Sequence, residues 1–277
     1  MGIKSCIKKI AKSLNAKEKI AVPYPVDKDQ ILKDKVVLVT GGTGGIGFAI
    51  AKAILAAGGK VVITGTTKEK VEKYKSKLNN DFAKGIILNL QDISSFDNKI
   101  EEALNQFDEH KIDVLINSAG VNPMKTFFDI KERDFDLTVS INVKGTYFLS
   151  QKIAKYMIEK KIKGHILNLS SASALRPAQS PYEISKWAIK GMTVGLADQL
   201  LPYGIIVNAI APGPTATPML GKDEKGDLDY PSIANGRFAT PEEIANLAII
   251  LISDYGNLVV GDTLYATGGS GLTTLHH

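Results

Sequence analysis

Short apolar runs alternate with longer amphipathic stretches along most of this chain. The apolar runs lie at 36–39, 61–64, 86–88, 114–116, 166–169, 205–207 and 264–265. They are apolar at almost every position and rich in β-branched residues, which is typical of strands buried on both faces of a parallel sheet. The stretches with helical periodicity lie between them, at 45–58, 68–80, 93–109, 131–160, 182–202 and 240–252. This repetition predicts an α/β fold with a doubly wound, mostly parallel sheet.

Two segments fall outside the alternation. Residues 1–30 hold seven lysines against three carboxylates, with apolar residues at helical spacing, and so form a basic amphipathic arm. We expect the arm to pack on the body or on a neighbouring subunit, although it could also lie on an anionic membrane surface. The polar stretch at 213–237 is long for a loop, which is typical of a lid over an active site. No linker divides 31–277, so we predict a single domain there.

Composition excludes several classes of protein. The chain has 277 residues, 44% hydrophobic and 23% charged, the ordinary globular balance. Its single cysteine allows no internal disulfide, and no apolar run is long enough to span a bilayer, so we expect a cytoplasmic protein. The net charge of +5 comes mostly from the arm, so nucleic acid is not an expected partner. The histidines have no partners at metal-ligand spacing, and no metal is expected.

The first candidate for chemistry is the glycine-rich turn Thr40–Gly47, between the first predicted strand and the first predicted helix. Glycines here let the backbone approach a pyrophosphate closely, while free N–H groups at the helix start face it. A glycine cluster can also be no more than a flexible turn. Its place after the first strand of a βαβ series favours a dinucleotide site on a Rossmann-type sheet.

The end of the second strand bears on which dinucleotide binds. An NAD site usually places a carboxylate there to hold the ribose 2′-hydroxyl. This chain has Thr66, Thr67 and Lys68 instead, and no carboxylate before Glu69. Hydroxyls, backbone N–H groups and a lysine would accept a 2′-phosphate, so the sequence favours NADP(H) over NAD(H). The two threonines can also cap the next helix, and the two roles are compatible.

A second candidate is the pair Tyr182 and Lys186, one turn apart on a predicted helix. Their side chains share a face. A free tyrosine has a pKa of about 10, too high for proton transfer at neutral pH, and a nearby ammonium lowers it by stabilising the phenolate. Such a pair can act as a general acid and base. In isolation the same spacing is usually just a surface pair.

Taken in order, these and further motifs over about 33–270 resemble the short-chain dehydrogenase/reductase family, in its branch of about 250 residues that includes 3-oxoacyl-acyl-carrier-protein reductases and related carbonyl reductases. The motifs are the turn Thr40–Gly47, the run Asn117-Ser118-Ala119-Gly120, Asn142, the pair Ser170-Ser171, Tyr182 with Lys186, Pro212-Gly213 and Thr217. The spacing of Gly41, Gly44 and Gly47 also fits a longer, epimerase-like branch, but the chain length and the Pro-Gly pair argue against it.

The resemblance implies hydride transfer between a nicotinamide and a carbonyl or secondary alcohol, with Tyr182 as general acid and base. It also implies that Ser171 holds the substrate oxygen and that Asn142 helps to hold a water linked to Lys186. Ser170 and Ser173 remain alternatives to Ser171, because the loop before the tyrosine is shorter than is usual in the family. The implied cofactor contacts are Gly41, Thr43, Gly45, Ile46, Gly47, Thr66, Thr67, Asn89, Leu90, Asn117, Ala119, Gly120, Tyr182, Lys186, Pro212, Gly213, Thr215 and Thr217. Members of the family are usually tetramers or dimers, so a homo-oligomer is expected, and a homotetramer is the assembly that we predict.

The substrate is less well defined by the sequence. Reductases of carrier-protein thioesters have basic residues before the serine-bearing strand and before the 205–207 strand. In this chain, lysines at 160–163 keep positive charge before the serine-bearing strand, but Tyr203 replaces the basic residue before the 205–207 strand. A missing rim charge slows electrostatically steered encounter, so we expect a free small carbonyl compound as substrate. A 3-oxoacyl-acyl-carrier-protein reductase is the alternative, and a non-catalytic NADP(H)-binding regulator is the alternative of another class.

Overall fold

The structure is a computed structural model that describes residues 30–222 and 226–271. Seven parallel strands form one sheet in the order β3-β2-β1-β4-β5-β6-β7. The strands are β1 Val36–Thr40, β2 Lys60–Gly65, β3 Ala83–Ile87, β4 Val114–Asn117, β5 His165–Leu169, β6 Ile206–Pro212 and β7 Thr263–Ala266. Every predicted strand is present, and the predicted doubly wound α/β fold is confirmed. The predicted arm, apart from its last residue, lies outside the described residues.

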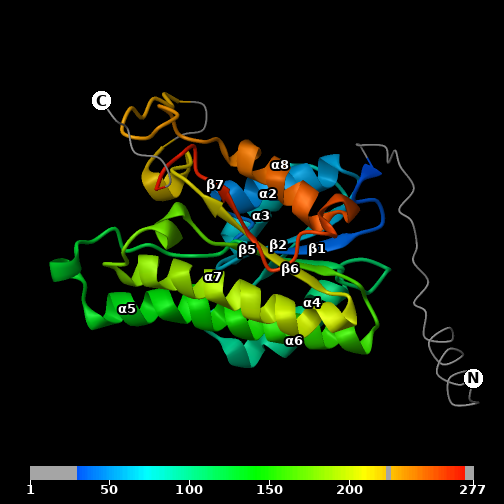
Figure 1. Cartoon of the computed structure of the whole chain (residues 1–277). Helices are drawn as coiled ribbons and strands as arrows, with labels where there is room; N and C mark the ends of the chain where they lie inside the picture. Colours follow the sequence, from blue (N-terminus) through cyan, green and yellow to red (C-terminus); the bar gives the residue numbers. More distant parts are fainter. Residues whose placement is uncertain (1–29, 223–225, 272–277) are drawn as a thin grey trace, which may run out of the picture.

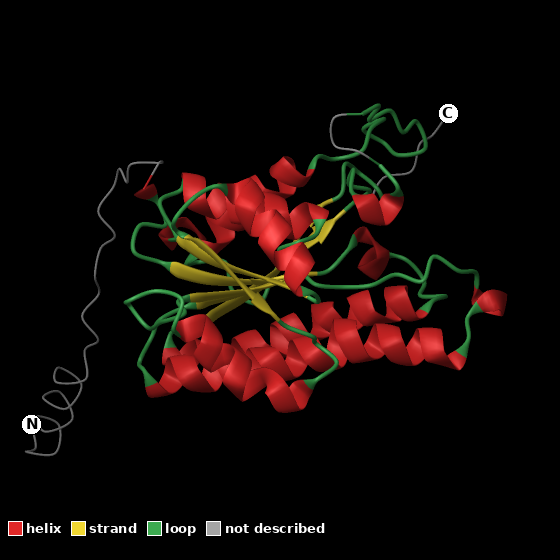
Figure 2. Ribbon diagram, turned by 180° about the vertical axis from the view of Figure 1, so that it is seen from behind, coloured by secondary structure: helices red, strands yellow, loops and turns green. Residues whose placement is uncertain are grey.

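Helices cover both faces of the sheet (Figure 1; Figure 2 shows the same layers from behind). On one face lie α2 Gly45–Ala56, α3 Lys68–Leu78 and α8 Pro241–Ile252, and on the other α4 Phe96–Leu104, α6 Thr146–Glu159 and α7 Pro181–Leu200. The stretch 131–160, which the periodicity predicts as one helix, divides into α5 Glu132–Val139, a π-helical turn at Ser140–Gly145 and α6. At Gly145 a Cβ would lie 2.4 Å from the Leu90 carbonyl oxygen, so the turn packs closely on the loop after β3.

The core consists of two apolar layers, one on each face of the sheet. In β1, Val37 and Val39 contribute to the layer under α2 and α8, while Leu38 between them contributes to the layer under α4 and α6. All three are at most 1% exposed. Burying each such side chain contributes about 1.5–3 kcal/mol. This double burial explains why the strands are apolar throughout and do not alternate.

The strand order reverses direction between β1 and β4, and ligands of such sheets bind outside the carboxyl ends of the strands at this point. The registers align Thr40 of β1 with Asn117 of β4, and Asn117 with Asn168 of β5. The Thr40 hydroxyl accepts hydrogen bonds from the amides of Ser118 and Ala119, at 3.1 and 3.2 Å. The glycine-rich turn and the segment after β4 are thereby held side by side, which positions the site.

Candidate active site

A cavity of about 780 Å³ opens at the carboxyl ends of the strands. It gathers most of the residues that the sequence predicts for the site, from seven separate segments of chain. Those that line it are Gly41, Thr43, Gly45, Ile46, Gly47, Thr66, Asn89, Leu90, Ala119, Gly120, Ser171, Tyr182, Lys186, Pro212, Gly213, Thr215 and Thr217. Three predicted residues are not in the lining, namely Thr67, Asn117 and Asn142.

The start of α2 is suited to an anion. Gly44 is its N-cap, with no side-chain cap bond, and the first turn holds no acidic residue. Amide donors at a helix start normally need such partners, so here they are left for a ligand. A Cβ at Gly47 would lie 2.3 Å from the Gly41 carbonyl oxygen, and one at Gly41, where φ is +65°, 2.8 Å from Ala119 Cα. The turn therefore needs glycine at both positions and fits the diphosphate of a dinucleotide.

The cavity wall after β2 is hydroxylic and basic. Thr66, Lys70, Lys73 and Tyr74 line it. Thr67 is instead the N-cap of α3, and its hydroxyl accepts a hydrogen bond from the amide of Lys70. Lys68, which the sequence suggests as one of the groups that accept the 2′-phosphate, does not line the cavity. Lys70 and Lys73 were missed, although their spacing of three residues on one helix could have found them.

Tyr182 and Lys186 lie in the first two turns of α7. The helix starts at Pro181, with a reciprocal capping box between Ser180 and Glu183 that fixes its first turn. The Lys186 ammonium donates a hydrogen bond to the Leu169 carbonyl at 2.7 Å and lies 5.5 Å from the centroid of the Tyr182 ring. Sheet and helix together therefore hold the pair on one wall of the cavity.

The protonation of this pair differs from the expectation. Burial lowers the pKa of Lys186 to about 8. Burial also raises the pKa of Tyr182 above its usual value, while a hydrogen bond with Ser171 opposes the rise. The expected lowering of the tyrosine pKa is therefore absent from the protein alone. The cause is that a phenolate would lose its hydration here, while the ammonium is directed at a backbone carbonyl.

The three candidate serines have different surroundings. Ser170 is buried and its hydroxyl donates to the Lys186 carbonyl at 3.0 Å. All three serines line the cavity, and Ser171 is the one that hydrogen-bonds with Tyr182. Its Oγ also accepts the amide of Ser173 at 3.1 Å, which orients the hydroxyl. Of the three, Ser171 is best placed to share a substrate oxygen with the tyrosine.

Asn142 lies in the π-helical turn, behind the cavity wall. Its Oδ1 accepts the amide of Val121 at 2.9 Å, and its Nδ2 donates to the Val121 carbonyl and to Ser185 Oγ, both at 3.0 Å. The Ser185 hydroxyl in turn donates to the Tyr182 carbonyl at 2.6 Å. Asn142 thus joins the segment after β4 to α7. Single π-helical turns are frequent at functional sites because they redirect a backbone within a helix.

Asn117 also points away from the cavity. Its Nδ2 donates to Ser150 Oγ of α6 and to Asn168 Oδ1 of β5, both at 2.9 Å. Asn168 Nδ2 continues the network to Thr193 Oγ1 of α7 at 3.0 Å. All four side chains are at most 4% exposed. The side chain of Asn117 therefore links the sheet to two helices, while the residues that follow it, from Ser118 to Asn122, line the cavity.

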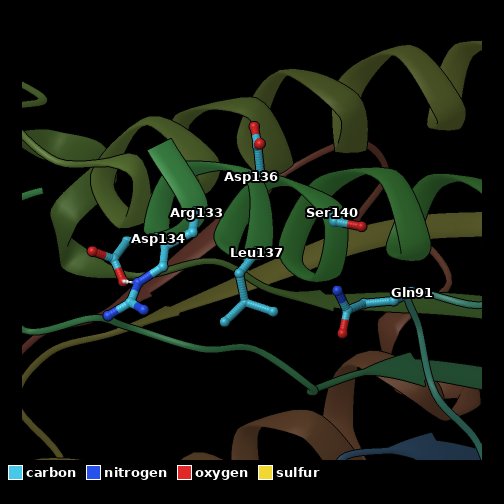
Figure 3. A pocket seen from close by; sticks show the side chains of 6 residues that line it. All are labelled: Gln91, Arg133, Asp134, Asp136, Leu137 and Ser140. Carbon is cyan, nitrogen blue, oxygen red and sulfur yellow. Dashed lines mark ion pairs between the residues drawn. The ribbon is translucent and has the colours of Figure 1, made fainter. Parts of the chain in front are cut away.

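A second, shallower hollow lies apart from these residues. It is lined by Gln91, Arg133, Asp134, Asp136, Leu137 and Ser140, and Figure 3 shows these side chains around it. It contains neither the tyrosine–lysine pair nor the glycine-rich turn, so we place the site in the larger cavity. Among the described residues, no group of His, Cys, Asp or Glu could hold a metal ion. In the same part of the chain, no helix is long and apolar enough to cross a membrane.

Comparison with known proteins agrees with this geometry. The sequence profile of the family described as short chain dehydrogenase matches residues 35–227. The chain belongs to the short-chain dehydrogenase family. The curated 3-oxoacyl-[acyl-carrier-protein] reductase of Aquifex aeolicus is 34% identical over 86% of this chain and 98% of that protein. The 3alpha-hydroxysteroid dehydrogenase of Mediterraneibacter gnavus is also 34% identical, over 87% of this chain and 98% of that protein.

Solved structures agree as well. The 3-ketoacyl-(acyl-carrier-protein) reductase of Brucella melitensis, solved in complex with NADH, is similar with a TM-score of 0.78 and 29% identity. That likeness covers 87% of this chain and 99% of the other. The seven-stranded sheet flanked by helices is thus that of a short-chain dehydrogenase. The relatives differ in substrate, so the family leaves the substrate open.

Proposed function

We propose that this protein is an NADP(H)-dependent oxidoreductase that interconverts a carbonyl and a secondary alcohol. The observation that carries the proposal is the meeting of Ser171, Tyr182 and Lys186 on one wall of a cavity whose other end is the glycine-rich start of α2. The family is one of oxidoreductases. A non-catalytic NADP(H)-binding regulator would have no need of this proton-transferring set.

The bound nicotinamide would donate or accept the hydride. In the reducing direction, Tyr182 gives its phenolic proton to the carbonyl oxygen, and Ser171 donates a hydrogen bond to the same oxygen and orients it. Lys186, with its pKa of about 8, then returns a proton toward the tyrosine. Asn142 fixes the helix backbone beneath the pair and, by family resemblance, helps to hold the water that connects Lys186 to solvent.

The preference for NADP(H) rests on the wall after β2. Lys70 and Lys73 provide positive charge near Thr66, and no carboxylate is among the described residues that line the cavity. A 2′-phosphate carries two negative charges at most, and an acidic residue there would repel it. We expect NADPH to exceed NADH by at least about tenfold in kcat/KM, or ~1.4 kcal/mol.

For the substrate, we propose a free small carbonyl compound in preference to an acyl-carrier-protein thioester. Tyr203 is 56% exposed at the place where carrier-protein reductases have a basic residue. The test compares kcat/KM for acetoacetyl carrier protein with that for small ketones. A carrier-protein value well above those of all the small compounds would favour the alternative, a 3-oxoacyl-acyl-carrier-protein reductase.

We also propose that the segment 213–237 is the lid over the active site. We further propose that the protein is a cytoplasmic homo-oligomer. The face formed by α5 and α7 exposes apolar side chains, among them Leu137 and Val194, which are 42% and 55% exposed. A homotetramer is the expected size, and light scattering coupled to gel filtration tests it. A monomer at micromolar concentration would contradict the proposal.

The decisive experiment removes one oxygen atom. Tyr182→Phe should lower kcat by at least about 10²-fold, because general acid catalysis is lost, while NADP(H) affinity stays within about twofold. The matched control is Tyr156→Phe on α6, where the hydroxyl bonds the His110 carbonyl far from the cavity. That variant should keep full activity. If Tyr182→Phe retains more than about a few per cent of turnover, the catalytic assignment is wrong.

A further inference from the structure

One charged side chain of the cavity has no place in the proposed reaction. The described residues that line the cavity include four cations, namely Lys70, Lys73, Lys186 and Arg176, and no carboxylate. Lys70 and Lys73 face the end that would hold the adenosine, and Lys186 belongs to the reacting pair. Arg176 lies five residues after Ser171, at the exposed end of the short helical turn Ala172–Leu175. It is therefore a cation on the substrate side.

The position of Arg176 is fixed on two sides. Its backbone carbonyl accepts a hydrogen bond from Trp187 Nε1 at 2.9 Å, and Trp187 is the next residue after Lys186 on α7. Its guanidinium donates to Ser270 Oγ, beyond β7, and Ser270 lines the same cavity. The loop is thus tied to the catalytic helix, and the guanidinium is tied to the segment that follows β7.

The guanidinium of Arg176 also differs from the two other arginines. Arg237 makes a two-bond ion pair with Glu243, at 2.8 and 2.6 Å, and Arg133 lies 4.0 Å from Asp134. Arg176 has no ion pair within residues 30–222 and 226–271, and its partner there is a neutral hydroxyl. An arginine carries five N–H donors in a planar fork, so most of this fork stays available.

Carboxylate and phosphate groups are the ligands that this fork fits best, because two parallel N–H···O bonds form at once. The cofactor phosphates would be held at the start of α2 and after β2, so the cofactor does not supply this anion. We propose that Arg176 binds an oxyanion on the substrate. The substrate class is then a carbonyl or alcohol compound that bears a carboxylate or a phosphate. This inference rests on the proposed function and narrows its substrate.

The test uses pairs of substrates that share the reacting ketone and differ in whether they bear an anionic group. One pair is acetoacetate and its methyl ester, and the other is dihydroxyacetone phosphate and dihydroxyacetone. With NADPH, the wild type should prefer the anionic member of at least one pair by about tenfold or more in kcat/KM. The pair that shows the preference tells carboxylate from phosphate. Equal use of both members in both pairs would overturn the inference.

Variants assign the preference to the side chain. Arg176→Gln keeps a donor for Ser270 and loses the charge, so it should raise KM for the anionic substrate by about tenfold, with kcat and the neutral substrate changed by less than about twofold. Arg176→Lys should recover part of the loss, since charge returns without the fork. Arg133→Gln is the matched control and should behave as wild type. Equal losses on charged and neutral substrates would mean that Arg176 only supports the loop.

The inference and the proposed function can fail separately. If neutral ketones are reduced and no anionic preference exists, the reductase proposal stands and the role of Arg176 does not. If no carbonyl compound is reduced, binding decides: calorimetry with acetoacetate on the NADP⁺ complex should give a Kd at least about tenfold weaker for Arg176→Gln than for wild type. Equal affinity in that measurement would also overturn the role of Arg176.

Discussion

The buried ammonium of Lys186 leads to a quantitative prediction about stability. Burial lowers its pKa from the usual 10.5 to about 8. The folded protein therefore releases this proton at lower pH than the unfolded chain does. Between about pH 8 and 10.5 the unfolded chain holds more protons, so this group makes the free energy of unfolding rise with pH. Below pH 8 both states are protonated, and the folded state carries the full desolvation penalty of the charge.

The size of the effect follows from the shift. A displacement from 10.5 to about 8 corresponds to ~3 kcal/mol in full, most of which develops between pH 7 and pH 10. Lys186→Met removes the charge and keeps a side chain of similar length, so this gain disappears. At pH 7 the variant loses the desolvation penalty but leaves the Leu169 carbonyl without its donor, which costs about 1–3 kcal/mol. The two proteins should therefore be close in stability at pH 7.

The assay is urea unfolding of wild type and Lys186→Met at several pH values from 7 to 10. The wild type should gain about 2–3 kcal/mol on the variant over this range, and Tyr182 is common to both proteins and cancels to first order. Lys190→Met, one turn further along α7 at a partly exposed position, is the control for loss of a lysine from this helix. A stability difference between wild type and Lys186→Met that stays constant with pH would refute the argument.

Further predictions follow from the cofactor end of the cavity. Gly47→Ala should weaken NADP(H) binding by more than about tenfold, because its Cβ would lie 2.3 Å from a backbone oxygen. The control is Gly191→Ala, whose Cβ would have open space around it. This control variant should bind NADP(H) normally and be more stable than the wild type by about 0.5–1 kcal/mol. Isothermal titration and thermal unfolding measure these, and normal binding by Gly47→Ala would contradict the phosphate site. Thr66→Asp should reverse the preference for NADPH, and Lys73→Gln should weaken NADPH but not NADH; kcat/KM with both cofactors decides. Removing residues 1–20 should leave the hydride chemistry intact, and loss of NADP(H) binding would show that the arm belongs to the site.

The sequence predicts the framework well because its signals are local and repeated. Every strand contains a short apolar run, and the burial of the inner strands on both faces is visible in the residues themselves. The one helix expected over 131–160 contains a π-helical turn, because Asn142 bonds to the backbone of Val121 and Gly145 packs on the loop after β3. Both contacts join segments distant in sequence, so helical periodicity carries no sign of them.

Side-chain direction is the other thing that the sequence leaves open. Asn117 ends a strand beside the cavity, yet its amide turns inward to Ser150 and Asn168. The choice among the serines is of the same kind, since the adjacent Ser170 and Ser171 both line the cavity, yet Ser170 bonds to the Lys186 carbonyl and Ser171 to Tyr182. Lys70 and Lys73 line the cavity and Lys68 does not, which depends on where α3 begins. Such differences arise from tertiary contacts and not from composition or spacing.

The interior hydrogen bonds explain how one site can serve different substrates. The helix α7, which carries Tyr182 and Lys186, is held to the sheet side by two interior hydrogen bonds. One runs from Ser170 to the Lys186 carbonyl and the other from Asn168 to Thr193. None of these bonds uses the segment 213–237 or the loop that carries Arg176. Side chains on those two segments can therefore vary while these bonds stay in place, because the loop that carries Arg176 is joined to α7 through a backbone carbonyl. Two relatives that are each 34% identical carry different names, 3-oxoacyl-[acyl-carrier-protein] reductase and 3alpha-hydroxysteroid dehydrogenase. Substrate identity must then be sought at the rim, where Arg176 is the charged side chain left without a role in the hydride chemistry.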